Sequence, residues 1–214
     1  MARHPGRDRD RAGLVAEALR RAGRTADGNA VEGVLAAIDR AGGQARLDGP
    51  GIDSDVGVHR ATYLAVFADA GLDEELAASL YEVASDPGLN PFADDVASVL
   101  RQQLRDQDKR VAVASDIHVD LRPVFANAGL DELVDVFTLS FEQGCQKPDP
   151  RMFTRTLTAL GVEPDQALMV GDRSRPDGAA VEAGLTTLLL PPLRGVDDRR
   201  LHHVTALCSA SQTT

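Results

Sequence analysis

Two carboxylates follow a short apolar run in the C-terminal half of the chain. The segment ALMVGDRSRPD, residues 167–177, leads from apolar residues directly to Asp172 and Asp177. Such a run predicts a buried β-strand, and ligand sites gather where parallel strands end. Because Mg²⁺ prefers carboxylate, phosphate and water oxygens, we expect these two residues to form a Mg²⁺ site. Alternatively, Asp172 caps the following helix and Asp177 is solvated on its first turn.

A second apolar run, VAVASD, ends in a hydroxyl residue. It predicts another strand, whose end presents the Ser115 hydroxyl and nearby backbone N–H groups to an anion. Lys147 precedes a stiff Pro-Asp-Pro turn that begins a helix. A fixed ammonium near carboxylates and a serine suits phosphoryl transfer, which is catalysed mostly by positioning and charge neutralisation. Ser115, the adjacent Asp116 and Lys147 are therefore the candidate substrate-binding residues.

These segments, in this order, resemble the second, third and fourth motifs of the haloacid dehalogenase (HAD) superfamily of hydrolases, which are mostly phosphatases. The likeness covers roughly residues 91–190. It implies an α/β fold, with a Rossmann-like parallel sheet as the HAD-like core and a helical cap subdomain. It also implies that Ser115 and Lys147 are catalytic, the first by hydrogen-bonding phosphoryl oxygens and the second by balancing charge. Asp172 would bind Mg²⁺, and Asp177 would support or share that site.

The first motif of the family is not evident. It is an N-terminal apolar strand that ends in Asp-x-Asp, in which the first Asp is the nucleophile and the second is the general acid/base. Asp8 and Asp10 have this spacing, but they follow His, Pro, Gly and Arg rather than an apolar run. In-line attack on phosphorus requires a fixed nucleophile. We therefore expect residues 1–13 to be a disordered or truncated N-terminus.

The missing strand has a structural consequence, because the resemblance places it at the centre of the sheet. Without it, two inner strand edges lack partners, which leaves backbone groups unpaired and invites aggregation. Two explanations stay open. The real start of the protein lies upstream of Met1, which we favour because the other motifs are intact, or the chain is a degenerate relative that has lost its nucleophile.

The apolar pattern changes its period near Pro91. Before this residue, apolar positions three and four apart predict helices over 14–22, 29–41, 58–70 and 73–84. By the resemblance, residues 14–88 would be the helical cap. His59 and Tyr63 lie four residues apart on one face of a predicted helix. We expect them to pack within the protein; the alternative is contact with a substrate.

After Pro91, strands alternate with helices, which predicts a parallel sheet covered on both faces. The expected helix spans 92–107, and the strands span 111–114, 136–139, 168–170 and 186–190. We assign the HAD-like α/β core to residues 89–205 and a flexible tail to residues 206–214.

Composition disfavours several other classes of protein. The 214 residues are 43% hydrophobic, enough for a substantial core, and their formal net charge of −10 disfavours binding to nucleic acid or an anionic membrane. No apolar run is long enough to span a bilayer or to act as a signal peptide, so we expect a cytoplasmic protein. Cys145 and Cys208 provide neither a disulfide framework nor a metal cluster.

Two functions are consistent with these residues. The first is a Mg²⁺-dependent phosphatase that acts on a small phosphorylated metabolite through an aspartyl-phosphate, and that is inactive as written if its nucleophile is missing. Haloacid dehalogenation would use the same nucleophile without a metal, and the pair Asp172 and Asp177 favours the metal-using chemistry. The second is a non-catalytic protein that binds Mg²⁺ and phosphorylated ligands, or a partner through its cap. The substrate and the oligomeric state leave no trace in the sequence.

Overall fold

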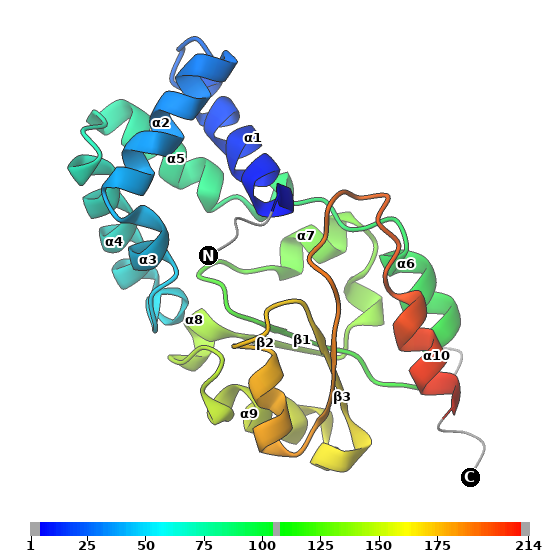
Figure 1. Cartoon of the computed structure of the whole chain (residues 1–214). Coiled ribbons are helices and arrows are strands. Elements are labelled where there is room, and N and C mark those ends of the chain that lie inside the picture. The colour runs from blue at the N-terminus through cyan, green and yellow to red at the C-terminus, as the bar shows by residue number, and fades with distance from the viewer. Residues whose placement is uncertain (1–4, 105–107, 211–214) are drawn as a thin grey trace. The chain divides into compact units, whose positions relative to one another are not determined.

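The chain consists of two compact units that meet at Asn90 and Pro91 (Figure 1). The computed structural model describes residues 5–104 and 108–210. The first unit contains helices and no strand among its described residues, and we call it the helical unit. The second, the strand unit, contains β1 to β4 together with the remaining helices. No helix in the described part of the chain is both long and apolar enough to cross a membrane.

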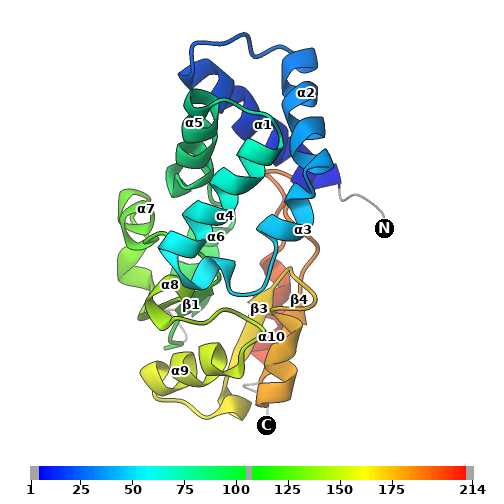
Figure 2. The same cartoon turned by 90° about the vertical axis from the view of Figure 1, so that its left-hand side faces the viewer.

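Figure 2 shows the helices of the helical unit, and their apolar side chains share one core. Aspartates begin three of these helices: the carboxylates of Asp27, Asp55 and Asp73 each accept a hydrogen bond from the backbone N–H three residues later. Val15, Val66 and other apolar side chains fill the core. The helices are α1 (Pro5–Arg21), α2 (Gly28–Arg40), α3 (Gly43–Leu47), α4 (Val56–Asp69) and α5 (Glu74–Ala84), and short 3₁₀ turns lie at Ile52–Ser54 and Pro87–Leu89.

Helix α1 begins at Pro5, so residues 5–13, for which disorder was one expectation, are helical. Residues 1–4 lie outside the described part of the chain. The helix extends this far because its inward side continues: Ala12 packs on the core, and Arg11 forms a 3.2 Å ion pair with Asp39 of α2. Asp8 and Asp10 therefore belong to a helix and do not follow a strand.

The strand unit carries the predicted strands within one residue of their expected ends. They are β1 (Ala112–Ser115), β2 (Val136–Leu139), β3 (Leu168–Gly171) and β4 (Thr186–Leu189). Between and around them lie α6 (Val96–Ser98), the π-helical η3 (Val99–Leu104), α7 (Arg122–Asn127), η5 (Asp131–Leu133), α8 (Ser140–Gln143), α9 (Pro150–Leu160), η6 (Pro164–Gln166), η7 (Gly178–Ala183) and α10 (His202–Ala210).

Two predicted boundaries in this unit need correction. The helix expected over 92–107 begins only at Val96, as α6, and continues as the π-helical η3 to Leu104. Residues 105–107 lie outside the described part. The flexible tail expected from residue 206 is helical through Ala210, because α10 packs against η3 and buries Val204. Residues 211–214 are outside the described part.

The four strands form two separate parallel pairs. Strand β1 pairs with β2 so that Ser115 lies opposite Leu139, and β3 pairs with β4 so that Gly171 lies opposite Leu189. No described strand joins β1 to β3. The residues of β1 and β3 are half-buried, whereas inner strands of a parallel sheet are normally buried on both faces. The single sheet that the sequence predicted is therefore divided in two, and a strand missing between the pairs stays a prediction.

Helix α9 packs against the strand pair of β1 and β2 and against η7. Asp149 caps it by accepting the N–H of Arg151, and Pro150 takes the first helical position, where no N–H is needed. The helix ends at Gly161, whose φ of 65° lies in the left-handed region. Its inward face packs against β1, β2 and η7, and the buried residues of this cluster are Phe153, Leu157, Ala180 and Leu185.

We expect Phe153→Ala to destabilise the strand unit by about 3–5 kcal/mol, because Phe153 is 2% exposed and its removal leaves a cavity. Urea denaturation followed by circular dichroism measures this loss. Thr158→Ala on the exposed face of α9 is the control, with an expected change of about 0.5 kcal/mol or less. Equal losses in the two variants would contradict the assignment of Phe153 to the core.

Candidate functional site

The predicted site residues of the strand unit come together where β1 and β3 end. Ser115 is the last residue of β1, and Asp172 directly follows β3. Lys147 lies in the turn between α8 and α9, and Asp177 lies at the start of η7. The carboxyl ends of parallel strands thus gather these residues, as their positions in the sequence predicted.

Lys147 links the ends of β1 and β3. Its Nζ donates a 2.6 Å hydrogen bond to Oδ1 of Asp177 and a 3.0 Å hydrogen bond to the carbonyl of Ala114 in β1. Its backbone N–H donates to Oδ1 of Asp116 at 2.8 Å. The side chains of Lys147 and Asp177 are 7% and 5% exposed. An ammonium buried in this way requires its partner, because an unpaired buried charge is very costly.

Asp177 also fixes the loop that follows β3. Its Oδ2 accepts hydrogen bonds from the backbone N–H groups of Asp172 and Arg173, at 3.1 and 2.9 Å. Gly171 allows this close approach, since a Cβ at that position would overlap the Asp177 carboxylate. Both oxygens of Asp177 are therefore occupied. This residue supports the site rather than standing free in it.

Asp172 is the accessible carboxylate of the predicted metal pair. Its side chain is 39% exposed, and its Oδ2 lies 3.6 Å from Nη1 of Arg200, in the segment after β4. The sequence analysis missed Arg200. No local signal points to it, because the chain reaches Asp172 only by returning from β4 toward α10.

Asp116 is enclosed by positive charge. Its side chain is 2% exposed, and its Oδ2 lies 3.7 Å from Nη1 of Arg173. Burial raises the pKa of this carboxyl, and the charges of Lys147 and Arg173 act against the rise. Each of the three carboxylates thus lies within 4 Å of a cationic group: Asp116 near Arg173, Asp172 near Arg200 and Asp177 near Lys147.

Ser115 differs from its neighbours because its hydroxyl has no hydrogen-bond partner within the described part of the chain. The residue is half-buried at the end of β1, and its backbone pairs with Leu139. A hydroxyl that the protein does not use is free to donate to a ligand oxygen. This is the arrangement expected of an anion-binding serine.

The donor set at these strand ends suits a hard cation. Asp172 offers carboxylate oxygens to solvent, and Asp177 holds the Asp172 backbone in place. Mg²⁺ is commonly held by one or two carboxylates that are completed by water and phosphate oxygens. The geometry therefore favours Asp172 as the direct ligand and Asp177 as its support, which is one of the two arrangements that the sequence left open.

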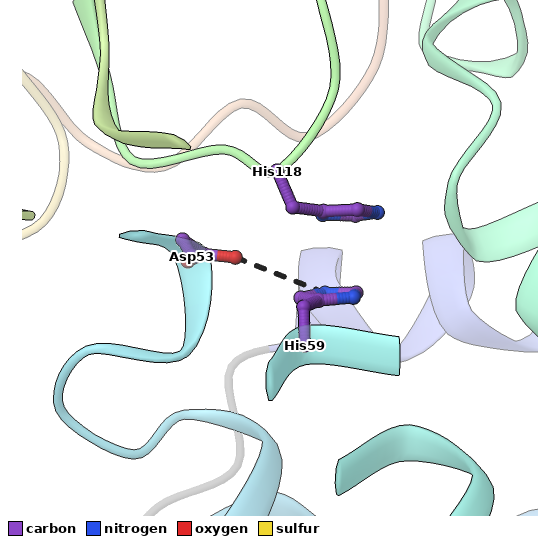
Figure 3. Close-up of side chains that lie close together, drawn as sticks. All are labelled: Asp53, His59 and His118. Carbon is purple, nitrogen blue, oxygen red and sulfur yellow. Dashed lines mark ion pairs between the residues drawn. The ribbon is translucent and has the colours of Figure 1, made fainter. Parts of the chain in front are cut away.

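His59 and Tyr63 take part in the packing of the helical unit. Their rings stack with centroids 4.1 Å apart, and Nδ1 of His59 lies 3.3 Å from the hydroxyl of Tyr81. Nε2 of His59 faces the carboxylate of Asp53 at 3.8 Å (Figure 3). His59 is 2% exposed, which agrees with the packing role that its helical spacing favoured.

Comparison with known proteins identifies the family. A family model described as haloacid dehalogenase-like hydrolase matches residues 10–184. This match covers most of the chain, which therefore belongs to the haloacid dehalogenase-like hydrolase family. The resemblance drawn from the three motifs is confirmed at this level.

Individual relatives are more distant. Glyceraldehyde 3-phosphate phosphatase from Methanopyrus kandleri is 31% identical over 102 residues, which are 47% of this chain and 43% of that protein. Phosphoserine phosphatase from Thermus thermophilus is 43% identical over 56 residues, which are 26% of this chain and 22% of that protein. The matches thus span less than half of either relative.

Solved structures share the fold. The HAD-hydrolase YfnB from Bacillus subtilis, in a crystal structure bound to magnesium, superposes with a TM-score of 0.67 at 13% identity. The superposition covers 94% of this chain and 92% of that one. At this identity the likeness establishes an α/β HAD-like fold and nothing about substrate.

We expect Lys147→Met to destabilise the strand unit by about 3–5 kcal/mol, because it leaves Asp177 buried without its ammonium partner. The double variant Lys147→Met with Asp177→Asn removes the stranded charge and should recover part of the loss. Denaturation in urea measures both variants. A Lys147→Met protein as stable as the wild type would show that the ion pair does not hold the strand ends together.

Proposed function

We propose that this chain provides the Mg²⁺- and phosphate-binding half of a HAD-type phosphatase that acts on a small phosphorylated metabolite. The observation that carries the proposal is the buried ammonium of Lys147, which contacts Ala114 of β1 and Asp177. Ser115 ends the same strand, and Asp172 follows β3 with an exposed carboxylate. The phosphatase names of two relatives, each of which is similar to part of this chain, support the phosphorylated substrate.

Each side chain has a role that follows from its surroundings. The Ser115 hydroxyl donates a hydrogen bond to a phosphoryl oxygen, and the Lys147 ammonium offsets the charge on the same group. Asp116 lies near the cations Arg173 and Lys147, and its carboxylate, while ionised, can only accept hydrogen bonds. Because phosphoryl oxygens are acceptors too, Asp116 would contact the substrate through its backbone N–H. Asp172 would hold Mg²⁺, which neutralises developing negative charge on phosphoryl oxygens.

The reaction further requires a nucleophilic carboxylate, which would form the aspartyl-phosphate. Asp8 and Asp10 lie on helix α1 of the helical unit and not at the end of any of the strands β1 to β4. The half-buried inner strands and the division of the sheet into two pairs support a strand between β1 and β3 as the source of this carboxylate.

A non-catalytic protein that binds Mg²⁺ and phosphorylated ligands is the second candidate. It is favoured by the same division of the sheet, since Ser115, Lys147 and Asp172 suffice for binding without a nucleophile. Haloacid dehalogenation fits less well, because it would proceed without a metal, whereas the exposed Asp172 carboxylate, supported by Asp177, suits a metal ligand.

The experiment measures Mg²⁺-dependent phosphate release from an aryl phosphate and a panel of phosphorylated metabolites. Two proteins are compared: the 214-residue chain, and the chain together with any residues encoded in frame ahead of Met1. We expect release only from the longer protein, because no strand between β1 and β3 supplies a nucleophilic carboxylate in the described part of the 214-residue chain. Asp172→Asn in the longer protein should lower the rate by about 100-fold or more.

Asp165→Asn, the same chemical change at an exposed site in η6, is the matched control and should leave the rate unchanged. An inactive longer protein that still binds Mg²⁺ through Asp172 would support the binding function instead. Release by the 214-residue chain that depends on Asp172 would mean that its nucleophile is present, and Asp8 and Asp10 would be the next residues to replace.

A further inference from the structure

Arg200 contacts the one carboxylate of the site that is open to a metal. Its Nη1 lies 3.6 Å from Oδ2 of Asp172, and its side chain is 17% exposed. The other two carboxylates of the site, Asp116 and Asp177, are 2% and 5% exposed and keep their own cationic partners. Arg200 is therefore the cation whose position bears directly on the accessible ligand.

The chain holds Arg200 in this position by two further contacts. The N–H of Leu201, the next residue, donates a 2.8 Å hydrogen bond to the buried carboxylate of Asp95. The Arg200 guanidinium also donates to the carbonyl of Pro191, at the start of the same segment. A side chain tethered in this way loses less entropy when it forms an ion pair than a free surface arginine does.

We propose that Arg200 is an internal counter-ion that competes with the divalent cation for Asp172. The inference rests on the proposed function, in which Asp172 binds Mg²⁺. Without metal, the guanidinium neutralises the Asp172 carboxylate and lowers the repulsion among three neighbouring acids. When Mg²⁺ binds, this ion pair must separate, and the remaining positive charge repels the metal. Arg200 thus weakens Mg²⁺ binding and keeps the metal-free site intact.

Isothermal titration of Mg²⁺ without substrate tests this role. We expect Arg200→Gln to bind Mg²⁺ about three- to tenfold more tightly than the wild type, as removal of one charge at this distance implies. Arg199→Gln is the matched control: the neighbouring residue is exposed, and the variant changes the net charge equally. Its affinity should stay within about twofold of the wild type, because solvent and salt screen exposed charges.

Two further variants separate the possible outcomes. Arg200→Lys keeps the positive charge, so it should bind Mg²⁺ like the wild type. Tighter binding by Arg200→Lys would overturn the electrostatic account. This test also stands if circular dichroism shows that Arg200→Gln does not fold. Equal affinities of wild type and Arg200→Gln, with binding abolished by Asp172→Asn, would overturn the counter-ion and leave the metal site standing. Absence of Asp172-dependent binding in every variant would overturn both.

Discussion

The ion pair between Lys147 and Asp177 is the contact on which the arrangement of the site depends. Strands of one sheet are normally joined by a ladder of backbone hydrogen bonds, but β1 and β3 belong to separate pairs. Lys147 connects their ends by contacting Ala114 on one side and Asp177 on the other. Asp177 in turn holds the backbone N–H of Asp172. The position of Asp172 thus depends on the buried charge pair, because Asp177, one member of the pair, accepts a hydrogen bond from the Asp172 backbone.

The sequence was informative where local pattern decides the structure. The apolar runs before Ser115 and Asp172 predicted strands that end within one residue of β1 and β3, because flanking polar residues limit each run. The same logic placed Asp172 and Asp177 at one strand end. It could not distinguish their environments, since the exposure of Asp172 and the burial of Asp177 depend on Lys147, which is distant in the sequence.

Residues whose positions depend on tertiary contacts escaped prediction. Arg173 and Arg200 are ordinary arginines in polar stretches, and only the folded chain brings them beside Asp116 and Asp172. The first turns of α1 were missed for a related reason: the local sequence is charged, and Arg11 finds its partner Asp39 on another helix. Local propensity is a weak guide wherever such contacts decide.

The division of the sheet into two strand pairs can be interpreted because the chain belongs to the haloacid dehalogenase-like hydrolase family. In this chain, β1 and β3 are only half-buried, whereas the strands inside a continuous parallel sheet are normally covered on both faces. Ser115, the buried Lys147 and the exposed Asp172 nevertheless lie at the ends of these strands. Under the proposed function, binding would need only these residues, whereas catalysis would need a further carboxylate.

The most direct measurement is a crystal structure of the protein with Mg²⁺ and orthovanadate, an analogue of the transferring phosphoryl group. The account predicts the anion within hydrogen-bond distance of the Ser115 hydroxyl and the Lys147 ammonium, Mg²⁺ on the Asp172 carboxylate, and the Asp177 contacts unchanged. An anion bound elsewhere, or Asp172 still paired with Arg200 and without metal at saturating Mg²⁺, would contradict it.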